Sequence, residues 1–188
     1  MYEFIFRIDG QIHFRCKLES IRCKDIKDNG QRCKRQTVMG SSFCYSHLLY
    51  KHKLRIKTSN IADAGFGLFA KDPYTNDKVV VFEKGDTIIK YSGEIIDEKE
   101  LIDRYDDKTA PYAILISRDR FEDGAKVRGV GSLANTFPNH QNATISVYQG
   151  FASLKATKTI YNNDEIYLSY GKSHKLGEEG VTHTTTQK

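Results

Sequence analysis

Three cysteines and one histidine near the N-terminus have the types and spacing of a metal site. Cys23, Cys33, Cys44 and His47 occur in the stretch IRCKDIKDNGQRCKRQTVMGSSFCYSHL. Only two residues separate Cys44 from His47, so a tight turn can aim both side chains at one ion, and Zn²⁺ takes four such ligands in a tetrahedron. A site with four protein ligands has no open position for a substrate. The pattern therefore predicts a structural zinc ion.

The segment around these ligands has few apolar residues, so a bound metal would supply the stability that burial cannot. All four cysteines of the chain lie between positions 16 and 44, and such clustering in an intracellular chain favours metal over disulfides. Cys16 is an alternative ligand, but Cys23 lies nearer the turn at 30–33. Free thiols beside an ordinary surface histidine are the other interpretation. The segment also resembles a small C…GxxC…CxxH module of eukaryotic and large-virus proteins.

Four further segments contain glycines, asparagines and tyrosines that could hold a cofactor and a side-chain substrate. In chain order they are AGFGLFA (64–70), IKYSGEII (89–96), SLANTFPNHQNATI (132–145) and DEIYLSYG (164–171). Glycine lets backbone approach a ligand closely, although a G-x-G pair alone equally serves an ordinary turn. A tyrosine near the end of a strand usually packs in a core, so each segment alone is weak evidence.

The elements around these segments predict a mostly β domain. Short apolar runs such as VVVF, TIIKY, YAILIS and TISVY alternate with turn signals at 84–86 and 123–124. Residues 97–105 have helical spacing, with Asp97 as the predicted cap. We predict an N-terminal segment with the zinc module at 1–50, a catalytic domain at 54–172 and a flexible tail at 173–188.

Taken together and in this order, the four segments resemble the SET-domain family of protein-lysine methyltransferases over about residues 54–172. The resemblance implies several small curved sheets in which the C-terminal segment threads under a loop, an exception to the rule against threading. It also implies that S-adenosylmethionine is the cofactor. The residues expected to hold this cofactor are Ala64, Gly65, Phe66, Gly67, Leu68, Asn135 and Thr136.

The same resemblance implies roles on the substrate side. Tyr170 matches the catalytic tyrosine of the family, and Tyr91 and Tyr112 match residues that line the channel for the substrate lysine. Aromatic walls accept the apolar lysine stem and the methylated ammonium. Leu168 stands where a family tyrosine tends to limit the product to monomethyl-lysine by a hydrogen bond. Because leucine cannot make that bond, we expect di- or trimethylation.

Several positions depart from the family pattern. Thr136 replaces the usual histidine, FPNHQ replaces a Ser-Cys-x-Pro run, and residues 72–86 form a longer link than usual. These departures resemble the compact, divergent SET proteins of large DNA viruses and some microbes. They also leave a second function open, in which an inactive SET domain binds chromatin, nucleic acid or protein through its basic zinc segment.

Charge divides the chain in two and suggests its partners. Residues 15–57 contain 12 Lys/Arg against 3 Asp/Glu, whereas residues 58–188 contain 16 against 19. The basic part could contact nucleic acid, or it could be only a solvated surface. The acidic part suits a substrate protein with a basic, lysine-containing segment, for which a histone is one candidate. No apolar run approaches the roughly 18 residues of a membrane span, and the N-terminus has no signal pattern. We expect an intracellular protein with no membrane contact, in the nucleus or cytoplasm, of a host cell if the source is viral.

Overall fold

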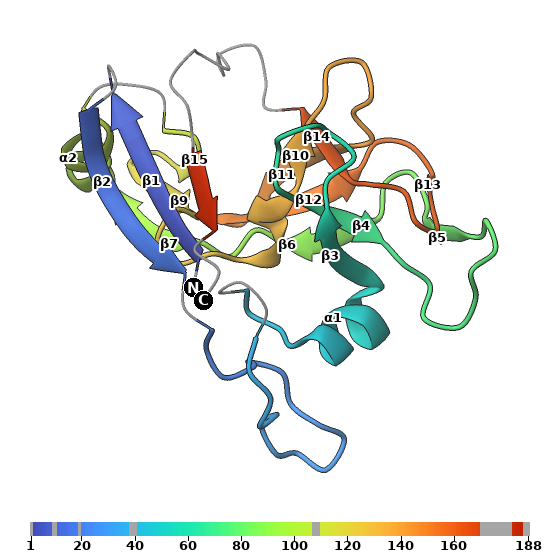
Figure 1. Cartoon of the computed structure of the whole chain (residues 1–188). Helices are drawn as coiled ribbons and strands as arrows, with labels where there is room; N and C mark the ends of the chain where they lie inside the picture. Colours follow the sequence, from blue (N-terminus) through green and yellow to red (C-terminus); the bar gives the residue numbers. More distant parts are fainter. Residues whose placement is uncertain are drawn as a thin grey trace.

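The computed structural model of the chain describes residues 2–8, 11–18, 20–37, 41–106, 110–169 and 182–185. Most of its described elements are short strands in several small sheets (Figure 1). One three-stranded sheet joins the two ends of the chain, since β1 (Tyr2–Ile8) lies between β2 (Gln11–Leu18) and β15 (Thr182–Thr185). The other residues of the predicted tail at 173–188 lie outside the described ranges.

The largest sheet contains the third and fourth motif segments. Its order is β10-β14-β11-β12-β6. The five strands are β6 (Thr87–Lys90), β10 (Asn135–Thr136), β11 (Ala143–Tyr148), β12 (Phe151–Ala156) and β14 (Tyr167–Ser169). The late strand β14 runs parallel to both neighbours and is inserted between β10 and β11, which are consecutive in the chain. The connection at 137–142 therefore spans this inserted strand.

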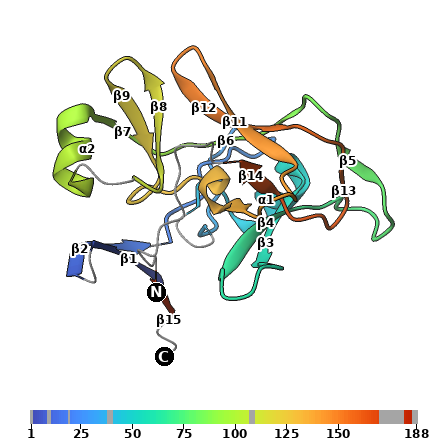
Figure 2. The same cartoon turned by 90° about the horizontal axis from the view of Figure 1, so that it is seen from above.

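Three smaller sheets complete the domain. Strands β3 (Leu54–Thr58) and β4 (Phe66–Ala70) pair with each other, as do β5 (Val80–Phe82) and β13 (Ile160–Tyr161). The third sheet has the order β7-β9-β8. Its strands are β7 (Glu94–Asp97), β8 (Ala113–Ser117) and β9 (Arg120–Asp123). Figure 2 shows this sheet and the neighbouring helix α2 at one end of the molecule, with β5 and β13 at the other.

The helices are short. They are α1 (Tyr45–His52), α2 (Glu98–Tyr105) and the 3-10 helix η1 (Val130–Leu133). The predicted cap of α2 is present, because the Asp97 carboxylate accepts a hydrogen bond from the backbone N–H of Glu100 at 2.8 Å. Helix α1 follows the cysteine segment and precedes β3, so it connects the predicted zinc module to the sheets (Figure 1).

One apolar core holds the domain of small sheets together. Strand β12 shows why it forms: in FASLKA the second, fourth and sixth residues are buried, which is the period-two pattern of a strand with one face inward. The core takes side chains from α1 and from several of the sheets, including Leu48, Leu54, Leu68, Ile89, Leu154, Ile166 and Leu168. The mostly β fold of small sheets with an N-terminal cysteine and histidine cluster confirms the predicted fold class. Across the described residues, no helix has the length and apolarity to cross a membrane.

Candidate functional site

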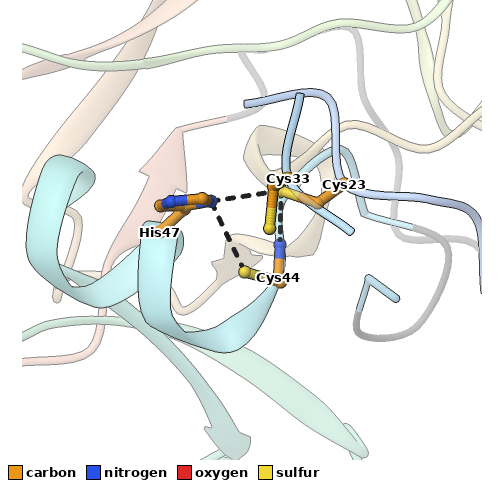
Figure 3. A group of neighbouring side chains, drawn as sticks. All are labelled: Cys23, Cys33, Cys44 and His47. Atoms are coloured by element: carbon orange, nitrogen blue, oxygen red, sulfur yellow. Dashed lines mark hydrogen bonds between the residues drawn. The ribbon is translucent and has the colours of Figure 1, made fainter. Parts of the chain in front are cut away.

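The structure brings together the four predicted metal ligands. The ligand atoms of Cys23, Cys33, Cys44 and His47 all lie within 4.8 Å of one another, and Figure 3 shows them converging from separate parts of the segment. The His47 Nδ1 atom lies 3.4 Å from the Cys23 sulfur and 3.5 Å from the Cys44 sulfur. Ligands about 2.0–2.3 Å from a zinc ion at tetrahedral angles lie roughly 3.4–3.8 Å apart. The cluster can therefore hold a zinc ion.

The local backbone aims these thiols and donates hydrogen bonds to them, whereas burial opposes their ionisation. Cys44 is the N-cap residue of α1 and His47 lies in its first turn, so the helix start aims both. The backbone N–H of Cys44 donates to the Cys23 sulfur at 3.2 Å. Burial raises the pKa of the Cys23 thiol. At Cys44 burial also opposes ionisation, but a hydrogen bond from the backbone of His47 and bonds from the other two thiols outweigh it and lower the pKa.

Two arginines that the sequence did not single out hold the loops of the cluster. The Arg22 Nε atom donates to the Cys33 carbonyl and the Arg32 Nε atom donates to the Cys23 carbonyl, both at 2.9 Å. Each guanidinium also donates to the carbonyl of the other arginine. This reciprocal pair crosses the hairpin and places two ligand residues opposite each other. Cys16 lies in β2, where the structure describes only the backbone, so its candidacy as a ligand stays open.

The first motif segment forms a turn that leads into β4. The backbone N–H of Ser59 donates to the carbonyl of Gly65 at 2.9 Å, and Gly65 has a φ of 70°. A left-handed conformation of this kind favours glycine. Ala64 and Phe66 are half-buried, Gly65 is exposed, and Leu68 is fully buried in the core. The segment thus exposes its backbone at Gly65, and the buried side chain of Leu68 anchors its other end in the core.

Gly67 has no room for a side chain. A Cβ atom at this position would lie 2.1 Å from Oε1 of Glu165 and 3.2 Å from Nδ2 of Asn135. The first motif segment therefore packs directly against residues of the third and fourth. Glycine is needed at position 67 because the backbone packs directly against the Glu165 carboxylate, and not because the position requires a positive φ.

Glu165 is the residue that joins these segments, although the sequence did not mark it as a site residue. Its Oε1 atom accepts from the Ser59 hydroxyl at 2.6 Å and from the Asn135 amide at 3.1 Å. Its Oε2 atom accepts from the Asn60 N–H at 2.7 Å and from the Tyr167 hydroxyl at 2.9 Å. A buried carboxylate needs such donors. In the sequence, the only sign of this role was that a charged residue begins an apolar run.

Asn135 occupies the middle of this network. Its Nδ2 atom is 3.1 Å from the Phe66 carbonyl, from the Ser59 hydroxyl and from Glu165, so its two hydrogens are shared among three acceptors. Across the part of the chain that the structure describes, no donor reaches its Oδ1 atom. That oxygen can therefore accept a hydrogen bond from a ligand.

Thr136 links the residues predicted to hold the cofactor to Leu168, which is predicted to line the lysine channel. It pairs with Leu168 in the parallel register of β10 and β14, and its hydroxyl donates to the Leu168 carbonyl at 2.5 Å. Leu168 itself is 1% exposed. Beside it, burial and the hydrogen bond to Glu165 raise the pKa of Tyr167 to about 12. Tyr167 therefore remains a neutral hydrogen-bond donor near neutral pH.

Tyr91 and Tyr112 also lie together. The Tyr91 hydroxyl donates to the Tyr112 carbonyl at 2.8 Å, and Tyr91 is 4% exposed. Tyr112 is half-buried, and the guanidinium carbon of Arg128 lies 4.6 Å from the centre of its ring. Burial and a backbone bond fix the position of Tyr91, which suits a wall residue and also fits ordinary core packing.

Glycines make the space that Tyr91 fills. A Cβ atom at Gly129 would lie 1.8 Å from the Tyr91 carbonyl oxygen, and one at Gly124 would lie 3.1 Å from the Tyr91 hydroxyl. Sequence reasoning treated Asp123-Gly124 only as a turn signal and did not predict these contacts. Only the folded structure reveals them, because they join segments more than thirty residues apart.

Tyr170, the predicted catalytic residue, lies outside the described residues, so its role stays a prediction. The description ends one residue earlier, at Ser169 at the end of β14. Of the predicted site, the structure therefore describes the hydrogen-bond network around Asn135 and Glu165, the Tyr91–Tyr112 pair and Leu168.

Comparison with known proteins places the fold. No family model and no curated protein matches this sequence. Solved structures of Polycomb Repressive Complex 2 from Chaetomium thermophilum do match. One, described as autoinhibited and bound to S-adenosylmethionine, has a TM-score of 0.51 at 20% identity over 63% of this chain. A crystal structure of the same complex has a TM-score of 0.52 at 21% identity over 70% of this chain.

The matching region is a small part of those larger proteins. This chain spans 15% of the length of the first solved chain and 16% of the second. A further structure, of the complex with H3K27me3 and H3K27M, has a TM-score of 0.52 at 20% identity. Likeness at this level of identity is evidence about architecture. The chain therefore has a mostly β, SET-like fold, with a cluster of three cysteines and one histidine on its N-terminal side.

Proposed function

We propose that this protein is an S-adenosylmethionine-dependent protein-lysine N-methyltransferase with a structural zinc module. The observation that carries the proposal is the junction of the motif segments around Glu165 and Asn135. Residues 59–67, 135–136 and 165–168 are far apart in sequence, yet one set of hydrogen bonds joins them. These are the segments that the SET resemblance assigns to cofactor and lysine binding, and a similar fold binds S-adenosylmethionine in a solved structure.

The residues present fit the cofactor. S-adenosylmethionine supplies a methyl group on a positively charged sulfur. The exposed backbone at 64–65 offers polar groups to a ligand, and the open Oδ1 atom of Asn135 can accept from the ammonium of an amino acid. Ser59 and Glu165 hold the Asn135 amide, so the acceptor oxygen is oriented before a ligand arrives.

The substrate side needs a channel that guides an uncharged amine. A lysine amine has a pKa of about 10.4 in water, and an apolar channel lowers that value by desolvating the ammonium. Tyr91, Tyr112 and Leu168 would form its walls, and Tyr170 would orient the amine or assist proton loss. The excess of Asp and Glu in residues 58–188 favours a basic protein segment as substrate. A histone tail is one candidate substrate of this kind, and the location we propose for the enzyme is the nucleus or the cytoplasm.

The test is methyl transfer from labelled S-adenosylmethionine to core histones and to total cell-extract proteins. We expect the wild type to label a protein and Tyr170→Phe to lose at least 100-fold in rate, the usual scale for a residue that acts at the reacting atoms. Tyr148→Phe is the matched control, because Tyr148 is 72% exposed at the tip of the β11–β12 hairpin. Equal activity of the two variants would remove Tyr170 from the mechanism.

Cofactor binding separates an enzyme from an inactive binding module. Calorimetric titration of the wild type with S-adenosylmethionine should show one site per chain. Asn135→Ala should weaken that binding by roughly tenfold, the effect of one lost hydrogen bond to a charged group. No binding by the folded wild type would favour the alternative, in which the domain docks on chromatin, nucleic acid or protein without catalysis.

Leu168 sets the expected product. Its side chain is buried in the core and cannot donate a hydrogen bond that would hold water or an amine in place. We therefore expect di- or trimethyl-lysine from the wild type, and a shift towards monomethyl-lysine in Leu168→Tyr. Mass spectrometry of the labelled protein decides this, and a wild-type spectrum with only monomethyl-lysine would contradict it.

A further inference from the structure

A groove on the zinc module has the charge and shape of a polyanion site. Its volume is about 610 Å³. The predicted metal ligands Cys33 and His47 line it, and the other lining residues are four cations, one carboxylate and one aromatic ring: Lys27, Lys34, Arg35, Lys51, Asp28 and Tyr50. We propose that this groove binds single-stranded nucleic acid, with phosphates on its lysines and a base against Tyr50. This inference does not depend on methyl transfer.

The cations in the groove are not all neutralised by the protein. Lys51 forms an ion pair with Asp25 at 2.9 Å, whereas Arg35 donates to the Ser46 hydroxyl, which is uncharged and leaves the charge of the guanidinium in place. By contrast, Lys27 and Lys34 are exposed, and no described residue contacts either ammonium group. Two exposed lysines on this concave surface that form no hydrogen bond or ion pair with the described residues are available to phosphates.

A bound zinc ion does not reverse this charge. Three thiolates, one neutral histidine and Zn²⁺ together carry a net charge of −1. Residues 20–57 contain 10 Lys/Arg against 2 Asp/Glu, so the module remains strongly basic with the metal in place. Charge of one sign over a small domain attracts polyanions and is lost as salt screens it.

Exposed aromatic rings favour a nucleic acid over an acidic peptide. Tyr50 is 57% exposed and Tyr74 is 85% exposed, and their ring centres are 6.2 Å apart. Tyr50 comes from α1 and lines the groove, and Tyr74 comes from the 72–78 loop, so two separate segments place their rings side by side next to the groove. Single strands expose base faces that stack on tyrosine, whereas the bases of a duplex stack on each other.

The loop that presents Tyr74 is fixed by hydrogen bonds. The Asp72 carboxylate accepts from the backbone N–H of Tyr74 at 2.8 Å and of Thr75 at 3.2 Å. The Lys71 ammonium and the Asn162 amide both donate to the Thr75 carbonyl. A ring held on an ordered loop loses less conformational entropy when it binds. The link at 72–86 is longer than is usual in the SET-domain family, and in this proposal its role is to present Tyr74 to a base.

The experiment measures fluorescence anisotropy of labelled oligouridine and oligothymidine with the zinc-loaded full chain. The charge variant is Lys27→Glu with Lys34→Glu. Its matched control is Lys84→Glu with Lys158→Glu, two exposed lysines outside the groove. We expect the groove variant to weaken binding by at least tenfold and to reduce the salt slope by about 1.4, since each phosphate contact on a single strand contributes about 0.7. The control should stay within about threefold of wild type, because its charge change is remote.

The aromatic contribution is measured separately. Tyr50→Ala with Tyr74→Ala should weaken binding by about tenfold or more, the effect of losing base stacking, while Tyr148→Ala leaves it unchanged. Zinc content and circular dichroism must match the wild type in every variant. If one of the paired changes alters the fold, Tyr50→Ala and Tyr74→Ala are measured singly.

Three results would overturn the proposal. If the groove variant and the control variant weaken oligonucleotide binding equally, the loss of affinity follows from net charge and not from the groove. Equal affinity for a duplex of the same sequence, with no effect of the tyrosine variants, would exclude single-strand recognition. Tighter binding of a phosphorylated acidic peptide, in competition with the oligonucleotide, would reassign the groove to a protein partner.

Discussion

The zinc module and the SET-like domain are stabilised by different means. Among the described residues of the module, the buried cluster is formed by Cys23, Cys33 and Cys44, and hydrogen bonds of Thr37 and Ser41 add to it. The domain instead has a continuous core of aliphatic side chains from most of its sheets. One chain thus combines a region built around a cluster that can hold a metal ion with a region built around a buried apolar core. The difference shows which sequence properties distinguish the two regions: their charge and their cysteine content, and not the number of residues in each.

Helix α1 is where the two regions meet. Cys44 and His47 face the metal cluster, while Leu48 and Leu49 are 2% and 3% exposed on the core side. The backbone N–H of Lys71, next to β4, also donates to the carbonyl of Lys53, just after α1. Loss of structure in one region can therefore destabilise the other through this helix. The predictions below test how strongly the stabilities of the two regions are coupled.

The largest effect should follow loss of the metal. Cys33→Ser, or a chelator, should remove one zinc ion per chain and unfold residues 20–42, because structural zinc contributes on the order of 10–16 kcal/mol in zinc-finger peptides. Hydrogen exchange at the amides of Cys23, Cys33 and Thr37 reports this directly. The amides of β11 and β12 should keep their protection, and their equal loss would show that the two regions unfold as one unit.

The next effect concerns a buried ion pair in the domain. Arg104 is 6% exposed and binds Asp123, which is fully buried, at 2.8 Å, and it also contacts Glu94 and Glu100. Arg104→Met should destabilise the domain by about 3–5 kcal/mol, because it leaves Asp123 buried without a countercharge. The double variant with Asp123→Leu should recover part of the loss. Urea denaturation measures both, and zinc content should stay at the wild-type value.

A smaller effect is expected at Gly67. Gly67→Ala should destabilise the domain by about 1–3 kcal/mol through overpacking. The alanine side chain would collide with the Glu165 carboxylate, which four hydrogen-bond donors hold in place. Affinity for S-adenosylmethionine should fall with it. In a Glu165→Ala background the same change should be nearly neutral, and a double-mutant cycle with no coupling between the two sites would contradict the packing.

The smallest effect is local to α2. Asp97→Ala removes the cap on the Glu100 amide and should destabilise the domain by about 1 kcal/mol. Asp103→Ala, at an exposed position in the same helix, is the control and should change stability by less than about 0.5 kcal/mol. Thermal denaturation resolves the difference, and equal effects of the two changes would remove the cap as the cause.

Local sequence signals predicted several features well. The spacing of Cys44 and His47 needs only the first turn of a helix to become a ligand pair, and Asp97 caps α2 through a residue three positions away. The apolar runs become strands, as β12 shows with its alternate buried residues. Each of these features involves a few consecutive residues, so propensity and periodicity were sufficient.

Long-range contacts were not predictable in the same way. Ser59 and Glu165 are 106 positions apart, and no local pattern indicates that a hydroxyl and a carboxylate will meet. The reciprocal bonds of Arg22 and Arg32 depend in turn on a hairpin that forms around the metal ligands. A charged residue in a sequence is usually solvated, and only its burial reveals a structural role.

The sequence by itself determined the mostly β class, the metal-ligand types, the cap of α2 and the division of charge, because these depend on composition and on neighbours within one turn or strand. Only the tertiary structure decided that β14 lies between β10 and β11, that Gly67 packs against Glu165 and that Tyr74 lies beside Tyr50, which lines a basic groove. The physical reason is the same in each case. Such contacts close long loops, and their free energy comes from burial and hydrogen bonds that exist only after the whole domain has assembled.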